Sequence, residues 1–321
     1  MKKLLFLLRI ALISVFFSCT ISCNGPVKEQ KSKDLKGKIS ISGAFAMYPL
    51  TVEWAEEFKK IHPDVTMDIS AGGAGKGMVD VMNGLVDIAM FSREVSPEEK
   101  SKGAWYIATA KDAVLPTINK SNPVFPELAV KGLKRQDFID IFITGSRKNW
   151  SGLVKTSNNK INLYTRSDAC GAAEMWAKYL GKKQEDLKGV GVYGDPGICD
   201  AVKNDKYGIG FNNIAYAYDP ATKENYNGIG IIPLDINEDG IIDSTESFYD
   251  NLDKLINAIK KGQFPSPPAR ELYFITKGKP EKPVIIEFLR FVLNEGQKYV
   301  HEAGYVELSD EKVKAEIEKL N

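Results

Sequence analysis

The sequence predicts an α/β protein of two lobes, with a cleft between them. Short apolar segments of strand length alternate with amphipathic helical segments along the chain, a pattern typical of α/β folds with parallel sheets. The chain has 321 residues, which is enough for two lobes with separate hydrophobic cores. Several predicted helices follow short turns of glycine or other small residues, and α/β proteins bind ligands at such junctions.

The first lobe is expected to comprise residues 38–112 together with about 280–321. Strands are predicted where apolar residues alternate or run together, at 38–42, 65–70 and 87–91. Residues 47–61 have helical apolar spacing, and a second helix follows the glycine-rich segment 72–77. Residues 283–303 are expected to form a pair of helices. These elements predict one parallel α/β lobe.

The second lobe is expected to span about residues 113–279. The chain is predicted to cross into it at 113–119 and to return toward the first lobe at 272–276. Further strands are predicted at 161–165, 208–211 and 229–234, and helices at 134–142, from Gly171, at 198–204 and at 248–259. The alternation of strands and helices therefore continues to the end of this lobe.

Four predicted helices begin next to small residues, near Ala46, Gly75, Gly171 and Gly197. The first N–H groups of a helix have no partner within the helix, and its N-terminus carries a partial positive charge, so helix starts attract anions. Arg166 lies just ahead of the helix that begins at Gly171, and an arginine adds a forked donor suited to an oxyanion. These features predict an anion site in the cleft.

The N-terminal segment 1–23 has the pattern of a lipoprotein signal peptide. Lys2 and Lys3 precede an apolar run, and Cys23 follows a lipobox-like sequence, so Cys23 is the expected lipidation site. An ordinary signal peptide cleaved near Cys19 or Cys23 remains the alternative. Residues 24–37 are polar and are expected to form a disordered tether. The protein is thus expected to be exported to the periplasm or cell envelope and held on the membrane by a lipid.

Composition and motif content exclude several classes of function. The 43 basic and 42 acidic residues give a formal net charge of +1, and no basic block indicates nucleic-acid binding. No nucleophile has a recognisable base partner, so an enzyme, in particular an exported hydrolase, is not expected. The sequence is compatible both with a disulfide between Cys170 and Cys199 and with two free thiols. A monomer is expected.

Seven segments in order resemble the phosphate-binding proteins of bacterial phosphate ABC transporters, the PstS-type periplasmic binding proteins. The resemblance runs from about residue 39 to about residue 308. The segments are SGAFAMYPL, GGAGKGMVDVMNGLVDIAMFSRE, LKRQDFIDIFITGSRKNW, TRSDACGAAEMWAKYL, GDPGICDAVKNDKYGIGF, ARELYFITKGKP and FLRFVLNEGQKYVHEAGYVEL. The resemblance implies two lobes joined by two crossing strands, which close over a dehydrated oxyanion such as inorganic phosphate. It also implies an ABC permease as partner.

The family's ligand contacts carry over to nine positions of this chain, four of which lack the hydroxyl group that the family usually has there. Alanine, phenylalanine and cysteine stand at several positions where the family has serine or threonine, while Ser92 keeps its hydroxyl. An unmet polar group costs about 1–3 kcal/mol, so the changed donors predict changed selectivity. The expected ligand residues are Ala44, Phe45, Gly75, Ser92, Arg93, Arg166, Cys170, Gly171 and Ala172.

Three hypotheses follow from the incomplete set of hydroxyl groups. The chain binds phosphate through backbone donors and Arg166, or it binds a different, partly organic anion. The remaining hypothesis is a PstS-like envelope adaptor that has lost small-ligand binding.

Residues 235–246, DINEDGIIDSTE, match the calcium loop of an EF-hand. Gly240 stands at the sixth position, where the loop turns sharply, and Ile242 is expected to anchor the loop inward. The flanks are not the usual pair of helices, so a structural Ca²⁺ in an insertion is predicted, with an acidic solvated turn as the alternative. The expected ligands are Asp235, Asn237, Asp239, the backbone carbonyl of Ile241, Asp243 and Glu246.

Overall fold

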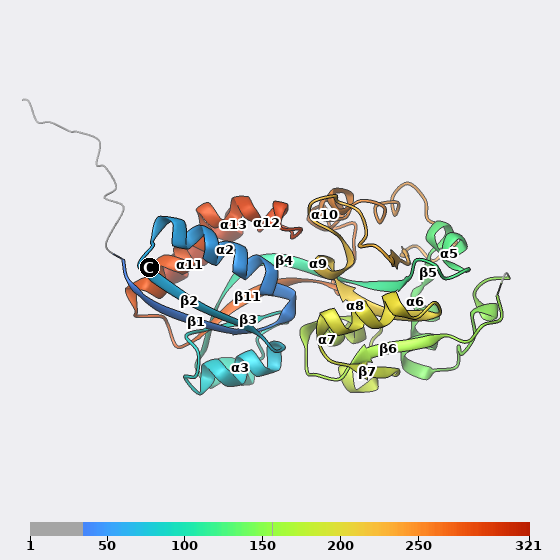
Figure 1. Cartoon of the computed structure of the whole chain (residues 1–321), viewed down its shortest axis with the longest axis horizontal. Helices are drawn as coiled ribbons and strands as arrows, with labels where there is room; N and C mark the ends of the chain where they lie inside the picture. The colour runs from blue at the N-terminus through green and yellow to red at the C-terminus, as the bar shows by residue number, and fades with distance from the viewer. Residues whose placement is uncertain (1–34, 156) are drawn as a thin grey trace, which may run out of the picture. The chain divides into compact units, whose positions relative to one another are not determined.

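The computed structural model describes residues 35–155 and 157–321 (Figure 1). The predicted signal peptide, the lipidation site Cys23 and most of the predicted tether lie outside these residues. No helix in the described part of the chain combines the length and the apolar character that a membrane crossing requires.

The described strands form a nine-stranded mixed sheet in the order β2-β1-β3-β11-β4-β8-β6-β7, with β9 also paired to β4. β1, β2 and β3 are parallel to one another, and β6 is parallel to β7 and β8. The strands are β1 Gly37–Gly43, β2 Val65–Ala71, β3 Ile88–Phe91, β4 Ala104–Asn119, β6 Asn162–Arg166, β7 Val190–Val192, β8 Gly208–Asn213, β9 Ile229–Ile231 and β11 Ala269–Lys277.

Two long strands connect the lobes, as the resemblance implied. β11 pairs antiparallel with residues 104–113 of β4, and each of the two strands contributes to both hydrophobic cores. In β4, Ile107 belongs to the first core and Ile118 to the second. In β11, Phe274 belongs to the first core and Ala269 to the second. The centre of the sheet is antiparallel, because the chain passes between the lobes in opposite directions in β4 and β11.

The helices cover the sheet segments of each lobe. Figure 1 shows α2 and α11 above β1 and β2, and α3 below them. The helices are α2 Tyr48–Ile61, α3 Ala74–Met82, α4 Pro97–Ser101, α5 Phe125–Lys131, α6 Arg135–Ile139, α7 Gly171–Tyr179, α8 Gly194–Asn204, α9 Ile214–Ala217, α10 Leu252–Lys260, α11 Pro283–Leu293, α12 Lys298–Glu302 and α13 Asp310–Leu320. A small separate sheet pairs β5 (Leu133–Lys134) with β10 (Leu234–Asp235) in parallel.

Two predicted helix boundaries were wrong. α8 begins at Gly194 rather than at 198, because Pro196 is compatible with the first turn of a helix, whose N–H groups need no helical partner. α10 begins at Leu252 rather than at 248, because the Asn251 side chain caps it by accepting from the N–H of Asp253 at 2.9 Å.

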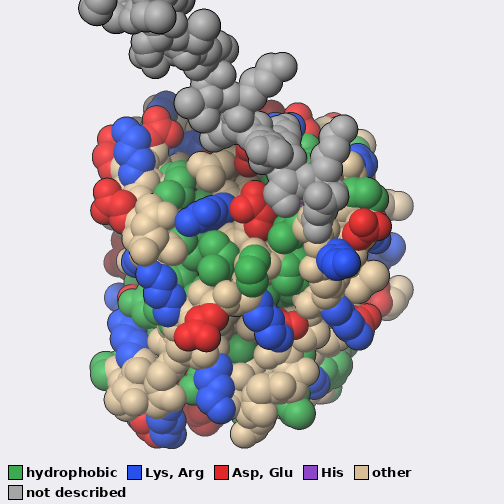
Figure 2. Space-filling view, turned by 90° about the vertical axis from the view of Figure 1, so that its left-hand side faces the viewer, with side chains coloured by type: hydrophobic (Ala, Val, Ile, Leu, Met, Phe, Trp, Pro, Cys, Tyr) green, Lys and Arg blue, Asp and Glu red, His purple; other side chains and the backbone are tan. Residues whose placement is uncertain are grey.

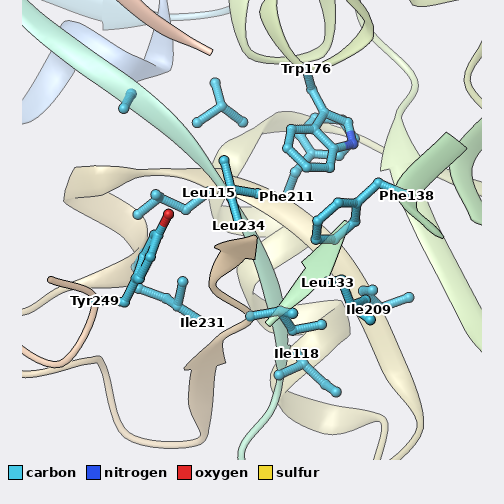
Figure 3. Close-up of a cluster of buried hydrophobic side chains, with 14 of the residues drawn as sticks. Leu115, Ile118, Leu133, Phe138, Trp176, Ile209, Phe211, Ile231, Leu234 and Tyr249 are labelled. Carbon is cyan, nitrogen blue, oxygen red and sulfur yellow. The ribbon is translucent and has the colours of Figure 1, made fainter. Parts of the chain in front are cut away.

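Each lobe has its own aromatic core. In the first, Trp54 packs edge-on against Phe274 with ring centroids 5.8 Å apart. In the second, Trp176 packs against Phe138 at 5.2 Å and against Phe211 at 6.3 Å (Figure 3). Burial of such apolar area is the main stabilising contribution to folding. The helix N-termini of each lobe are therefore held in place by that lobe's own hydrophobic core.

The face drawn in Figure 2 carries side chains of both charges. Lysine and arginine side chains, with fewer aspartate and glutamate side chains, lie there around a group of hydrophobic side chains.

Candidate functional site

The N-termini of α3 and α7 meet although they belong to different lobes. The N–H of Gly75 in α3 donates to the carbonyl of Ala169, just ahead of α7, at 3.4 Å. Gly171 lies against Ser92 so closely that a Cβ added to Gly171 would come within 2.1 Å of the Ser92 carbonyl oxygen and 2.4 Å of its Oγ. The lobes thus touch at residues that the sequence assigned to the anion site.

Arg166 lies at this junction and is already paired with two carboxylates. Its side chain is 1% exposed, and its Nε and Nη2 donate to Asp168 at 2.8 and 2.6 Å. Nη1 donates to Asp195 at 2.5 Å. Each terminal nitrogen carries two N–H groups, so one on each remains for an anion. Two N–H groups of Arg166 are therefore not used by these carboxylates.

The pKa values around Arg166 reflect burial and ion pairing. Burial raises the pKa of Asp168, but hydrogen bonds and attraction from Arg166 outweigh burial and hold that pKa below its usual value. Burial lowers the pKa of Arg166, and attraction to Asp195 outweighs it, so the net shift is upward. Arg166 and Asp168 are both charged at neutral pH. The junction thus contains one guanidinium held between two carboxyl groups.

Cys170 caps α7 instead of supplying a hydroxyl. Its Sγ accepts from the N–H of Ala173 at 3.4 Å, and burial raises the pKa of the thiol to about 12. The N–H groups of Gly171 and Ala172 have no hydrogen-bond partner among the residues that the structure describes. Cys170 and Cys199 are free thiols rather than a disulfide. The first turn of α7 therefore offers two amides to a ligand.

Phe45 brings an aromatic ring to the same junction. Ala44, beside it, donates its N–H to Met90 at 2.9 Å, which fixes the turn after β1. The ring of Phe45 lies 5.6 Å from the Arg166 guanidinium carbon and 5.7 Å, edge-on, from the ring of Tyr193. The hydroxyl of Tyr216 donates to the Phe45 carbonyl at 3.2 Å. An apolar surface therefore borders the charged cluster.

Arg93 was expected to contact the anion, but its guanidinium is paired with two carboxylates. Its guanidinium donates to both oxygens of Glu99 at 2.7 and 3.0 Å and lies 3.1 Å from Glu174. It also stacks 4.3 Å from the centroid of the Phe91 ring. The structure thus places Arg93 in a local ion-pair cluster between the lobes, with Glu174 belonging to α7.

Sequence reasoning missed a buried ion pair on the crossing strands. Arg270 of β11 lies 3.0 Å from Asp112 of β4, and its Nη1 donates to the carbonyl of Gly171 at 3.3 Å. Burial raises the pKa of Asp112 to about 6, against the opposing attraction of Arg270. The sequence did contain a signal for this pair, namely one charged residue inside each of two apolar strands. Buried strands rarely contain unpaired charges, so two such residues indicate an ion pair.

Comparison with known proteins identifies the family. The family model described as the PBP superfamily domain matches residues 28–295. The chain belongs to the PBP superfamily. It is 27% identical to "Phosphate-binding protein PstS" of Methanocaldococcus jannaschii, across 100% of this chain and 96% of that protein. Another protein of the same name, from Staphylococcus aureus strain RF122, is 25% identical across 93% and 87% of the two chains.

A solved structure shares the fold of this PBP superfamily member. It is a putative phosphate ABC transporter substrate-binding protein from Clostridium perfringens with bound phosphate, at a TM-score of 0.70 and 24% identity, covering 85% of this chain and all of that one. The two-lobed fold and the resemblance to PstS-type proteins are confirmed. The relatives carry the names of binding proteins, not of enzymes, in agreement with the sequence prediction.

Proposed function

We propose that this chain is the phosphate-binding component of an ABC transporter. The observation that carries the proposal is the meeting of two helix N-termini from different lobes beside Arg166. Free amides at a helix N-terminus and a guanidinium with unused N–H groups are complementary to a small oxyanion. The PstS names of the relatives that cover nearly the whole chain support phosphate as the anion.

Closure of the lobes over the ligand supplies the mechanism of capture and release. Contacts across the junction, such as Gly75 with Ala169 and Tyr216 with Phe45, form only when the lobes are together. A ligand held by donors of both lobes stabilises the closed form by its differential affinity for that form. A permease that favours the open form would then release the anion into the transport path.

Calorimetric titration of the mature protein with phosphate tests this function. We expect saturable binding of phosphate and much weaker binding of sulfate, since a protonated phosphate oxygen can donate a hydrogen bond that sulfate at neutral pH lacks. Absence of binding for every oxyanion would overturn the proposal and favour the envelope adaptor.

A different anion with an apolar part is the second candidate function. The specific observation that favours it is the Phe45 ring, which lies between Arg166 and Tyr193. An aromatic ring contributes packing area but no hydrogen bond. Adding benzoate and other small carboxylates to the same titration separates this candidate, because tighter binding of a carboxylate than of phosphate would favour it.

We also propose that Cys23 anchors the exported protein to the membrane by a lipid. The lipobox-like sequence and the polar tether after it support this anchor. Cys23→Ser should move the protein from the membrane fraction to the soluble fraction, while the matched variant Cys19→Ser should leave it membrane-bound. Retention of the Cys23→Ser protein on the membrane would contradict the anchor.

A further inference from the structure

Residues 235–246, the calcium-loop segment, are fixed at their start by the second core. Leu234 directly precedes the segment and is fully buried among the core side chains of Figure 3. It pairs with Leu133 in the small β5–β10 sheet. Phe248, two residues after the segment, is buried in the same core. The segment is therefore a loop held at both ends, which limits the positions its side chains can reach.

Hydrogen bonds from the loop backbone fix the side chains of Asp235 and Asn237. The N–H of Gly240 donates to Asp235 Oδ2 at 2.8 Å, and Gly240 has a φ of +93° that favours glycine. The N–H of Asp239 donates to Asn237 Oδ1 at 2.9 Å. These bonds leave Asp235 Oδ1 and other side-chain oxygens available to a common partner.

Two carboxylates of the loop are buried without a compensating charge. Asp235 is 1% exposed and Glu246 is 3% exposed. Glu246 Oε1 accepts from the N–H groups of Ile236 and Asn237 at 2.6 and 2.9 Å. Asp235 Oδ1 and Glu246 Oε2 have no hydrogen-bond partner, and no lysine, arginine or histidine in the described part of the chain forms an ion pair with either residue. Buried charges of this kind require a counter-charge.

We propose that Ca²⁺ is this counter-charge. Asp235 and Glu246 stand at positions one and twelve of the loop pattern and would ligate through the unpartnered oxygens. No three His, Cys, Asp or Glu side chains are grouped as a metal cluster in residues 35–155 and 157–321, so the shell needs neutral oxygens as well. Asn237 Oδ1, the Ile241 carbonyl and water are oxygens of that kind, and such mixed oxygen shells suit Ca²⁺.

Binding would reorganise the exposed half of the loop. Asp239 Oδ2 accepts from Asn237 Nδ2 at 3.2 Å in an exposed contact. On Ca²⁺ binding, Asp239 would leave this contact and ligate the ion. Ile242, as expected, packs inward: a Cβ added to Gly132 would lie 2.5 Å from Ile242 Cδ1, and the Ile242 N–H donates to the Val130 carbonyl at 3.3 Å. Ca²⁺ would thus brace α5 and β5 within the second lobe, independently of the anion site.

Thermal unfolding and calorimetry of the EDTA-treated mature protein test the proposal. We expect Ca²⁺ to raise the melting temperature and to bind with higher affinity than Mg²⁺, which accepts irregular shells poorly. Glu246→Gln should weaken Ca²⁺ binding at least about tenfold because it removes a charged bidentate ligand. The variant should keep the metal-free melting temperature, since glutamine retains a carbonyl acceptor for Ile236 and Asn237.

Two exposed positions supply matched variants. Glu238→Gln removes a neighbouring charge at a position that is not a ligand, and it should bind Ca²⁺ as the wild type does. Asp239→Asn changes an exposed ligand and should weaken binding, which keeps the test decisive if Glu246→Gln does not fold. The proposal is overturned if Ca²⁺ neither binds nor shifts the melting temperature, or if Glu246→Gln and Asp239→Asn bind it as tightly as Glu238→Gln.

Discussion

Gly171→Ala should hold the lobes apart and weaken phosphate binding by about tenfold to a hundredfold or more. The added methyl would lie 2.1 Å from the backbone carbonyl oxygen of Ser92, in the opposite lobe. A backbone oxygen on a sheet strand's end cannot rotate aside, so the lobes must separate. Overpacking of this kind costs about 1–3 kcal/mol, occasionally more, and each 1.4 kcal/mol is about a factor of ten in affinity. Calorimetry measures the affinity.

Gly75→Ala, at the same junction, is the milder comparison. Its added Cβ would lie 3.3 Å from the Ala169 Cβ, a distance that a small adjustment relieves, so this variant should weaken phosphate binding much less than Gly171→Ala does. Small-angle scattering with saturating phosphate should show a larger radius of gyration for Gly171→Ala alone. Equal affinities for Gly171→Ala and the wild type would rule out closure at this contact.

Arg166→Met should lower the free energy of unfolding by about 3–5 kcal/mol, because removing one partner of a buried ion pair leaves uncompensated charge. Asp195 is 2% exposed at its side chain and Asp168 is 11% exposed, so both carboxylates would lose their counter-charge. Urea denaturation measures the loss. The same variant should show no phosphate binding, because it lacks the guanidinium.

The loss of unfolding free energy caused by Arg166→Met should become smaller as the pH falls. The pKa of Asp168 is lowered in the folded wild type, so its contribution to stability is present above the pKa of the unfolded chain and is lost on acidification.

Adding Asp195→Asn to Arg166→Met should recover part of the stability. The half-buried Arg290, whose Nη2 donates to Asn321 at 3.1 Å in a solvent-exposed contact, is the control, and Arg290→Met should change stability by at most about 0.5 kcal/mol. A similarly small change for Arg166→Met would show that its ion pairs contribute little.

The strands and helices that the sequence predicted are those with strong apolar periodicity. β1, β2 and α2 have nearly the predicted bounds, because alternation and helical spacing are local properties. The resemblance supplied the two crossing strands. The length of β4 was missed, because the half-buried Trp105 and Tyr106 and the charged Lys111 and Asp112 interrupt the apolar pattern.

The candidate site was harder to predict than the fold. The sequence indicated that Gly75, Ser92 and Gly171 belong to one cleft, and the structure brings these three together. It did not indicate that Asp195 neutralises Arg166, because that pairing depends on where α8 begins. Arg270 and Asp112 are 158 residues apart, and only the pairing of β4 with β11 makes them neighbours. Such contacts depend on tertiary geometry, which local patterns do not encode.

A crystal structure of the mature protein grown with phosphate tests the central claim most directly. We expect phosphate oxygens within about 3 Å of the Gly171 and Ala172 amides, the usual N–H···O distance, with Arg166 and Ser92 Oγ as further donors. The claim is contradicted if saturating phosphate is bound elsewhere, or if the junction of α3 and α7 remains filled by protein side chains alone.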